Sequence, residues 1–189
     1  RQIYENNAAL RAGKWVRRTG CNVWRKCIGM IGFGRIGQAV AKRAKGFDMD
    51  VRVYDPYVNP ANFSGQAVRF CDKEALLQGS DIVTLHCRLN DTTKNFIGAA
   101  EFALMKPTAF LINTARAGLV NRDSLQQALK SAAIAGAAVD VFQTEPAGED
   151  PLIKANLENL LLTPHVGSYT VETLDQMDRL AVLNITESE

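Results

Sequence analysis

The stretch Ile28–Gly37 reads IGMIGFGRIG, in which three glycines follow an apolar run in the spacing GxGxxG. Each glycine has its own physical reason: Gly32 allows a tight turn, Gly34 lets the backbone approach a pyrophosphate, and Gly37 lets a helix pack closely on a strand. The amides at the start of the following helix carry a partial positive charge that stabilises a phosphate. The stretch therefore predicts a strand, a phosphate-binding turn and a helix.

A carboxylate follows at the expected distance. Asp55 ends the next apolar run, roughly 20 residues beyond the glycines, where its oxygens can accept both hydroxyls of an adenosine ribose. The same charge repels a 2′-phosphate, so we predict NAD rather than NADP as the cofactor. Glycines alone could form only a tight turn, but strand, helix and acid together favour a dinucleotide site.

Short apolar runs alternate with helical patterns along the rest of the chain, which is typical of parallel strands buried on both faces and joined by helices. We predict an α/β fold: a Rossmann-like doubly wound parallel sheet with helices on both faces, in a single domain over residues 1–189. The predicted strands are Cys27–Ile31, Asp50–Tyr54, Asp81–Leu85, Ala109–Ile112, Gly136–Val141 and Leu160–Thr163. The predicted helices are Arg35–Lys45, Lys73–Gln78, Ala99–Leu104, Ser124–Ala132 and Thr170–Asn184.

Two of these helices begin with side chains suited to capping. Asn121 and Thr170 each place an oxygen where it can accept a first-turn amide. The last helix also carries an apolar stripe that includes Leu174 and Met177, and we expect this stripe to pack against the core.

Composition narrows the class of partner. The 189 residues are 47% hydrophobic and 22% charged, close to the usage of globular proteins, which excludes disorder and coiled coils. The 22 basic and 20 acidic residues are interspersed, so we expect no nucleic acid and no membrane as partner, but a small molecule. The four cysteines form no closely spaced pair and the two histidines lie far apart, so we expect no metal site and a cytoplasmic location.

Polar residues follow three later strands of the predicted sheet. These segments are Asn113–Arg116, Asp140–Glu145 and Thr163–His165. Because the carboxyl ends of parallel strands meet at one edge of a sheet, where ligands bind, we expect Arg116, Glu145 and His165 to share a crevice. An arginine, a carboxylate and a histidine suit chemistry on a carbonyl that lies beside a carboxylate.

Each of these side chains also has an ordinary structural explanation. Arg116 could be a surface partner of a helix, Glu145 a solvated loop acid, and His165 a loop residue whose ring is satisfied. His86 and Cys87 close an apolar strand, and we assign them a structural or cofactor-lining role, because no base accompanies the thiol to make it a nucleophile.

Six segments together resemble the nucleotide-binding domain of the D-isomer-specific 2-hydroxyacid dehydrogenases, and the resemblance covers nearly the whole chain. They are AGKW at Ala12–Trp15, IGFGRIG at Ile31–Gly37, VYDP at Val53–Pro56, INTARAG at Ile112–Gly118, AAVDVFQTEP at Ala137–Pro146 and LLTPHVGSYT at Leu161–Thr170. The resemblance implies an oxidoreductase that passes a hydride between nicotinamide and a small 2-keto or 2-hydroxy acid, with phosphoglycerate, hydroxypyruvate and glyoxylate as first candidates.

The resemblance also assigns roles. Arg116 would hold the substrate carboxylate and polarise the 2-keto oxygen, His165 would transfer the proton, and Glu145 would contact the imidazole and favour its protonated form. The implied cofactor contacts are Gly32, Gly34, Arg35, Ile36, Gly37, Asp55, Cys87, Thr114, Ala115, Arg116, Asp140, His165, Gly167 and Ser168.

Two positions depart from the pattern of the family. Arg88 stands where a proline is usual after His86, which leaves the rigidity of that loop open. Ala117 follows Arg116 where a glycine is common, and it would be strained if the position requires a positive φ.

Length suggests that one domain of two is present. Members of the family add a substrate domain formed by both chain ends, so we expect an excised or naturally minimal cofactor domain that binds NAD with little turnover. The resemblance implies a homodimer through the cofactor domain, with Arg1–Trp15 as an arm, although this segment could instead form a solvated helix. The alternative function is an NAD(H)-responsive protein-binding module, similar to the transcriptional corepressors of the family.

Overall fold

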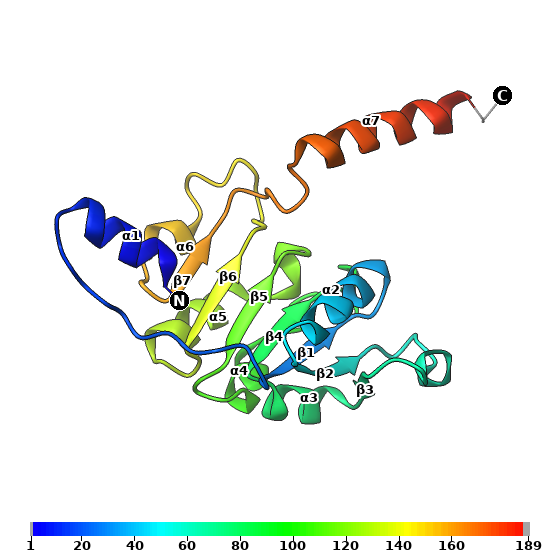
Figure 1. The fold of residues 1–189 in the computed structure, drawn as a ribbon, viewed down its shortest axis with the longest axis horizontal. Coiled ribbons are helices and arrows are strands. Elements are labelled where there is room, and N and C mark those ends of the chain that lie inside the picture. The colour runs from blue at the N-terminus through cyan, green and yellow to red at the C-terminus, as the bar shows by residue number, and fades with distance from the viewer. Residues whose placement is uncertain (1, 187–189) are drawn as a thin grey trace.

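The computed structural model describes residues 2–186, and within them the centre of the molecule is a seven-stranded sheet (Figure 1). Every neighbouring pair of strands is parallel, and the strand order is β3-β2-β1-β4-β5-β6-β7. The order reverses direction between β1 and β4, which is the switch point at which such sheets bind ligands. The predicted doubly wound α/β fold is confirmed.

The elements lie close to their predicted bounds. The strands are β1 (Cys27–Ile31), β2 (Asp50–Tyr54), β3 (Arg69–Phe70), β4 (Ile82–Leu85), β5 (Phe110–Asn113), β6 (Gly136–Val139) and β7 (Leu160–Leu162). The α-helices are α1 (Ile3–Arg11), α2 (Arg35–Lys45), α3 (Lys73–Gly79), α4 (Ala99–Leu104), α5 (Arg122–Lys130), α6 (Pro151–Lys154) and α7 (Val171–Thr186), and short 3₁₀ helices are η1 (Pro60–Phe63) and η2 (Ala117–Leu119). The sequence did not predict β3 and α6, because segments of two and four residues show no periodic pattern.

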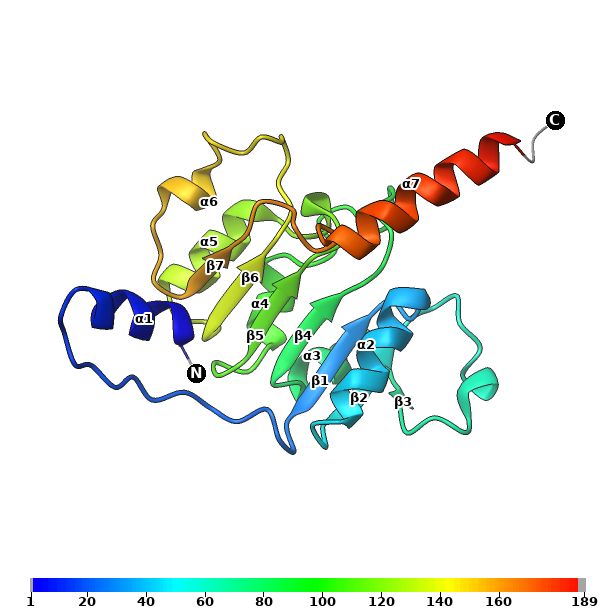
Figure 2. The ribbon, with the colours of Figure 1, turned by 45° about the horizontal axis from the view of Figure 1, so that its top comes forward.

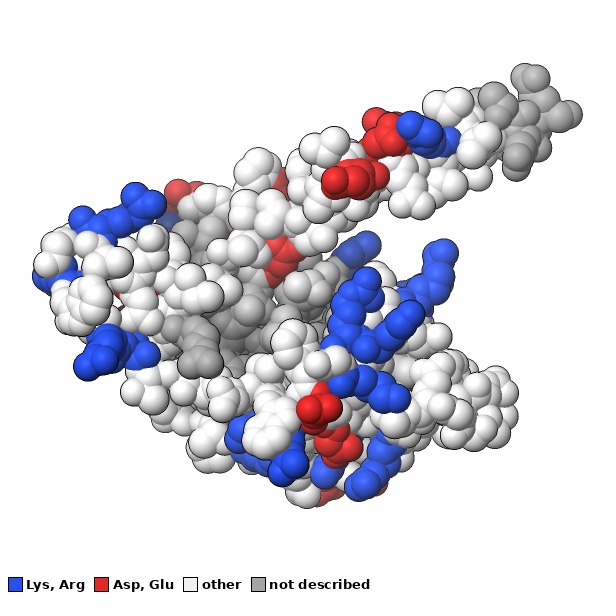
Figure 3. Space-filling model, in the orientation of Figure 1, with Lys and Arg blue, Asp and Glu red and all other residues white. Residues whose placement is uncertain are grey.

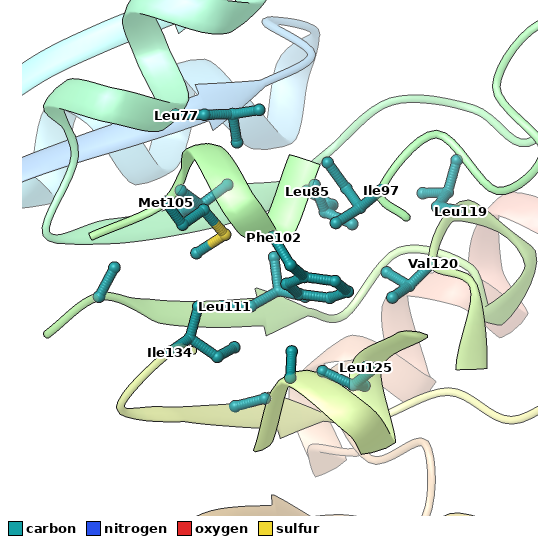
Figure 4. Close-up of a cluster of buried hydrophobic side chains, with 14 of the residues drawn as sticks. Leu77, Leu85, Ile97, Phe102, Met105, Leu111, Leu119, Val120, Leu125 and Ile134 are labelled. Carbon is teal, nitrogen blue, oxygen red and sulfur yellow. The ribbon is translucent and has the colours of Figure 1, made fainter. Parts of the chain in front are cut away.

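Two apolar clusters cover the two faces of the sheet, and β1 contributes to both. Met30 packs with α2 on one face, whereas Ile31 packs with α3, α4 and α5 on the other. Figure 4 shows Phe102 of α4 lying among the side chains of Leu85 and Leu111, which come from two adjacent strands. All five residues of β1 are buried, as expected for a strand covered on both faces.

Both predicted caps are present. The side chain of Asn121 accepts from the amide of Ser124 at 2.9 Å, and the hydroxyl of Thr170 accepts from the amide of Thr173 at 3.2 Å. Each bond satisfies one of the amides that a helix start leaves without a backbone partner.

The two terminal helices lie outside the body of the molecule. Helix α7 projects away from the sheet in both ribbon views, so the prediction that its apolar stripe packs on the core is wrong (Figures 1 and 2). Leu174 and Met177 are exposed, because no other described element of the chain covers this helix. Helix α1 buries no residue either.

Charge is distributed as the composition suggests. Figure 3 shows both signs on the face in view, with basic side chains most frequent around α2, whose last turn holds Lys42, Arg43 and Lys45. Among residues 2–186, no helix has both the length and the apolar character needed to cross a bilayer.

Candidate cofactor and substrate site

The glycine turn depends on close backbone contact between β1 and β4. Gly32 has a φ of +95°, and a Cβ added there would lie 2.5 Å from the amide nitrogen of Cys87 and 2.6 Å from the carbonyl carbon of His86. Only glycine avoids both the left-handed strain and this clash. The predicted tight turn is therefore present, and it sets the end of β1 against the end of β4.

The other two glycines have different surroundings. A Cβ on Gly34 would meet nothing within 4 Å, so the start of α2 is open on this side, and no side chain caps it. The spacing predicts that Gly37 lets the helix pack closely on the strand. A Cβ on Gly37 would lie 2.5 Å from the carbonyl oxygen of Gly32, the residue that follows β1. Arg35 and Ile36 form the exposed first turn of α2, where a pyrophosphate can meet unpaired amides.

Asp55 is fixed beside this turn. One carboxylate oxygen accepts from the amide of Phe33 at 2.8 Å, and the other accepts from the amide of Tyr57 at 3.0 Å. Each oxygen keeps a further lone pair for a ribose hydroxyl. Arg52 points away from Asp55, because its guanidinium donates to the carbonyl of Ala75 at 3.2 Å. The residues present therefore fit a dinucleotide.

His86 and Cys87 directly follow β4 and are half-buried. Burial lowers the pKa of His86, whose Nε2 lies 3.1 Å from the hydroxyl of Thr84, so the ring is neutral at neutral pH. Burial raises the pKa of the Cys87 thiol, and the nearby charge of Asp55 raises it further. A protonated thiol supports a lining role rather than a nucleophilic one.

The loop after His86 is ordered without a proline. The hydroxyl of Thr93 donates to the carbonyl of Arg88 at 2.7 Å, and the side chain of Asn90 accepts from the amides of Thr92 and Thr93 at 3.0 Å each. These hydrogen bonds hold the turn after His86, whose rigidity was an open question because Arg88 stands where the family usually has a proline.

Arg116 lies in the loop after β5, with an exposed guanidinium that donates to the carbonyl of Ala115 at 2.6 Å. Ala117 begins η2 and has no positive φ, so the strain considered for it is absent. Asn113 lies in the first of the polar segments that follow the later strands, but no role of its own was predicted for it. Its carboxamide forms hydrogen bonds to the main chain of Ala115 and Arg116.

Glu145 and His165 are in direct contact. Nδ1 of the imidazole lies 2.8 Å from a carboxylate oxygen of Glu145, whose other oxygen accepts from the amide of Phe142 at 3.0 Å. The Phe142 amide and the imidazole together lower the pKa of Glu145, so this carboxyl is ionised at neutral pH. With Nδ1 paired, Nε2 is the ring nitrogen that remains for a substrate.

Asp140 holds the loop that carries His165. Its side chain is 4% exposed and accepts from the hydroxyl of Thr163 and from the amides of Val166 and Gly167, at 2.9 and 3.0 Å. Burial by itself raises the pKa of Asp140, but these hydrogen bonds outweigh it and the net shift is downward. His165 has a φ of 54°, a left-handed conformation that this network maintains.

The predicted site residues thus fall into two groups at one edge of the sheet. The turn after β1 and Asp55 form the first, and the loops after β5, β6 and β7 form the second. The structure brings Glu145 and His165 into contact but records no contact between Arg116 and this pair. Thr114, Gly167 and Ser168 are exposed at the same edge.

Comparison with known proteins supports the assignment of a dinucleotide-binding fold. Residues 1–167 match the model of the D-isomer specific 2-hydroxyacid dehydrogenase NAD-binding domain. The chain belongs to this family. Its relatives include the glyoxylate reductase of Thermococcus litoralis, 41% identical over 98% of this chain and 58% of that protein, and the D-3-phosphoglycerate dehydrogenase of Methanocaldococcus jannaschii, 41% identical over 91% of this chain and 33% of that protein.

Solved structures of the family are also similar. A glyoxylate reductase from Paecilomyes thermophila has a TM-score of 0.90 at 33% identity, over 100% of this chain and 57% of that one. An NAD-complexed D-isomer specific 2-hydroxyacid dehydrogenase from Lactobacillus delbrueckii has a TM-score of 0.85 at 30% identity, over 97% of this chain and 62% of that one. The predictions of family, fold and NAD as cofactor are confirmed, and the chain spans about half the length of many relatives.

Proposed function

We propose that this chain is the cofactor half of an NAD-dependent dehydrogenase that interconverts a small 2-hydroxy acid and its 2-keto acid. The observation that carries the proposal is the 2.8 Å contact between His165 and Glu145, at the same sheet edge as the glycine turn and Asp55. Relatives named glyoxylate reductase, D-3-phosphoglycerate dehydrogenase and D-lactate dehydrogenase support this class of substrate.

In the proposed reaction, bound NADH supplies a hydride to the second carbon of the keto acid and becomes NAD⁺. His165 donates a proton to the 2-keto oxygen, so that the carbonyl becomes a hydroxyl, and it takes the proton back in the oxidation. Glu145 accepts from Nδ1, which orients the ring and leaves Nε2 for the substrate. Asp140 keeps the His165 loop in its left-handed turn.

Arg116 binds the substrate in this proposal. A guanidinium presents two parallel N–H groups that match a carboxylate, and its charge also polarises a neighbouring carbonyl. The side chain is exposed, and its bond to the Ala115 carbonyl can be exchanged for the stronger bonds to a carboxylate. The exposed Thr114, Gly167 and Ser168 are assigned to the cofactor, as the resemblance implies.

We also propose that residues 1–189 form one NAD-binding domain and that two copies pair as a homodimer. In support, Ile3, Tyr4 and Leu10 of α1 are 75%, 72% and 58% exposed. A helix of nine residues that buries nothing is not stable alone in water, so it needs a partner surface. The arm was predicted from Arg1, which lies outside the described residues. Light scattering of the purified chain tests the proposed homodimer, and a monomer mass would contradict it.

The cytoplasmic location stays a prediction.

The first experiment measures cofactor binding by the purified chain. We expect NADH titration to show saturable binding, and NADPH to bind more weakly because Asp55 repels a 2′-phosphate. We expect little turnover of glyoxylate by the chain alone, since one wall of a cleft does not exclude water from the substrate. Robust turnover would contradict that expectation.

The second experiment tests the chemistry in a chimera. Residues 1–189 replace the matching segment of the archaeal glyoxylate reductase, and glyoxylate and hydroxypyruvate reduction are assayed. His165→Ala should reduce kcat by about 10²- to 10⁴-fold, the usual contribution of a general acid, with unchanged NADH affinity. Glu149→Ala is the control, because this exposed carboxylate pairs with Lys154 and lies outside the proposed proton transfer. Full activity of His165→Ala would exclude the proposed mechanism.

A further inference from the structure

The side chain of Asn113 is a buried polar group that the proposed reaction does not use. Asn113 is the last residue of β5 and is 1% exposed. A carboxamide buried to this degree requires hydrogen-bond partners, because an unpaired polar group in the interior is destabilising. Its oxygen accepts from the amide of Ala115 at 3.1 Å, and its nitrogen donates to the carbonyl of Arg116 at 3.0 Å. Both ends of the carboxamide therefore act on the loop that carries the guanidinium.

The Arg116 carbonyl has a second donor. The amide of Leu119 donates to it at 3.2 Å, which closes the first turn of η2. Asn113 thereby joins the end of β5 to the start of η2, whose Gly118 and Leu119 are buried. With both sides of the Arg116 main chain fixed, Ala117 enters η2 without a positive φ and no glycine is needed there.

Asn113 is also tied to the proton-transfer loop. Its carbonyl accepts from the amide of Asp140 at 3.0 Å, and the Asp140 side chain holds the amides of Val166 and Gly167. The main chain at Arg116 and the loop that carries His165 are therefore both held by hydrogen bonds to residues at the ends of β5 and β6, which are adjacent strands.

We propose that Asn113 is a positioning residue for substrate binding: its carboxamide fixes the Arg116 main chain, and with it the origin of the guanidinium relative to His165. The inference rests on the proposed function for the role of Arg116. The contacts of Asn113 themselves do not depend on that function.

Three variants separate this role from ordinary strand-end stability. Asn113→Leu removes both hydrogen bonds, whereas Asn113→Asp keeps the acceptor for Ala115 and removes the donor to Arg116. Asn159→Leu is the matched control. Asn159 is half-buried and donates to the carbonyl of Leu129 at 3.2 Å, but it lies before β7, at the opposite end of the sheet.

The first measurement uses the free chain and NMR. The Ala115 amide should exchange with solvent about 5- to 10-fold faster in Asn113→Leu, which corresponds to the net value of one hydrogen bond, and it should stay protected in Asn113→Asp and Asn159→Leu. The carbonyl ¹³C resonance of Arg116 should move in both Asn113 variants, because both lose its donor. An unmoved resonance and unchanged exchange would overturn the inference.

The second measurement uses the chimera and separates substrate from cofactor. In Asn113→Leu and Asn113→Asp, kcat/KM for glyoxylate should fall about 10- to 100-fold through a higher KM and a lower kcat, the expected cost of a misplaced catalytic group. Asn159→Leu should lower Tm without this loss. Unchanged KM and kcat in both Asn113 variants would also overturn the inference. If the unsubstituted chimera has no turnover, the proposed function fails, and the NMR result alone decides the role of Asn113.

Discussion

The two halves of the site are built by different means. Around β1 and β2, the cofactor half depends on glycines that carry no side chain. Gly32 and Gly37 let main-chain segments approach closely, and Gly34 leaves space for a phosphate. Around β5, β6 and β7, the proposed catalytic half is shaped by buried or ionised side chains, such as Asp140 and Glu145, that hold loops by hydrogen bonds. The first half should therefore fail when atoms are added, and the second when hydrogen bonds are removed.

Adding one methyl group to the cofactor half should give the largest effects. In Gly32→Ala, the left-handed φ and the clash with Cys87 should cost at least about 2 kcal/mol of stability and abolish NADH binding.

In Gly34→Ala, the fold should keep its Tm because nothing lies within 4 Å of the added Cβ. NADH should nevertheless bind about 100-fold more weakly if two charged hydrogen bonds to the phosphate are lost.

Gly65→Ala is the control, since its added Cβ also meets nothing within 4 Å and the residue lies between η1 and β3 rather than in the GxGxxG segment. Thermal melting and NADH titration measure all three variants. Equal NADH affinity in Gly34→Ala and Gly65→Ala would contradict the assignment of the turn.

Removing a buried charge from the catalytic half should give the next effect. Asp140→Asn should lose about 1–3 kcal/mol at pH 7, because two loop amides and one hydroxyl lose a charged acceptor. The folded pKa of Asp140 lies below its ordinary value of 3.8, so its contribution is present above pH 3.8 and is lost as the pH falls through the folded pKa.

Urea unfolding at pH 7 and pH 3 checks this expectation. The difference in unfolding free energy between the wild type and Asp140→Asn should shrink at pH 3. Other carboxyls with lowered pKa values, Asp81, Glu101 and Glu145, are present in both proteins and cancel. A difference that stays constant with pH would show that the charge of Asp140 does not hold the loop.

Glu145→Gln should give a smaller effect, confined to activity. The pair with His165 is half-exposed, so stability should change little, whereas kcat for glyoxylate reduction in the chimera should fall about 10-fold. NADH affinity, measured by titration, should stay unchanged, because Glu145 contacts the imidazole and not the glycine turn. Unchanged kcat in Glu145→Gln would contradict the role of this carboxylate in orienting the imidazole.

Ala117→Gly should give the smallest effect. Because Ala117 has no positive φ, glycine relieves no strain and only raises the entropy of the unfolded chain, at a cost of about 0.4–1 kcal/mol. Tm should fall slightly. A rise in Tm would show that the alanine is strained after all.

Prediction from the sequence succeeded where a local pattern has one structural solution. The bounds of β1, α2 and α4 match their predictions, because buried runs and amphipathic periods are fixed by neighbouring residues. It was wrong for the apolar stripe of α7, since a period of apolar residues indicates that a face needs cover but not what covers it. It gave Asn113 no role of its own, because an asparagine at a strand end is equally typical of an exposed turn.

The amino-acid sequence by itself determined most of the strands and helices along the chain, the glycine turn, and the acid that follows it, since each is set by residues close together in the chain. Only the tertiary structure decided which polar groups meet. The contacts of His165 with Glu145, of Asp140 with Val166 and Gly167, and of Gly32 with Cys87 join residues far apart in sequence. Such contacts form only when parallel strands align their carboxyl ends, because the sheet register sets the distance between loops that share no local pattern.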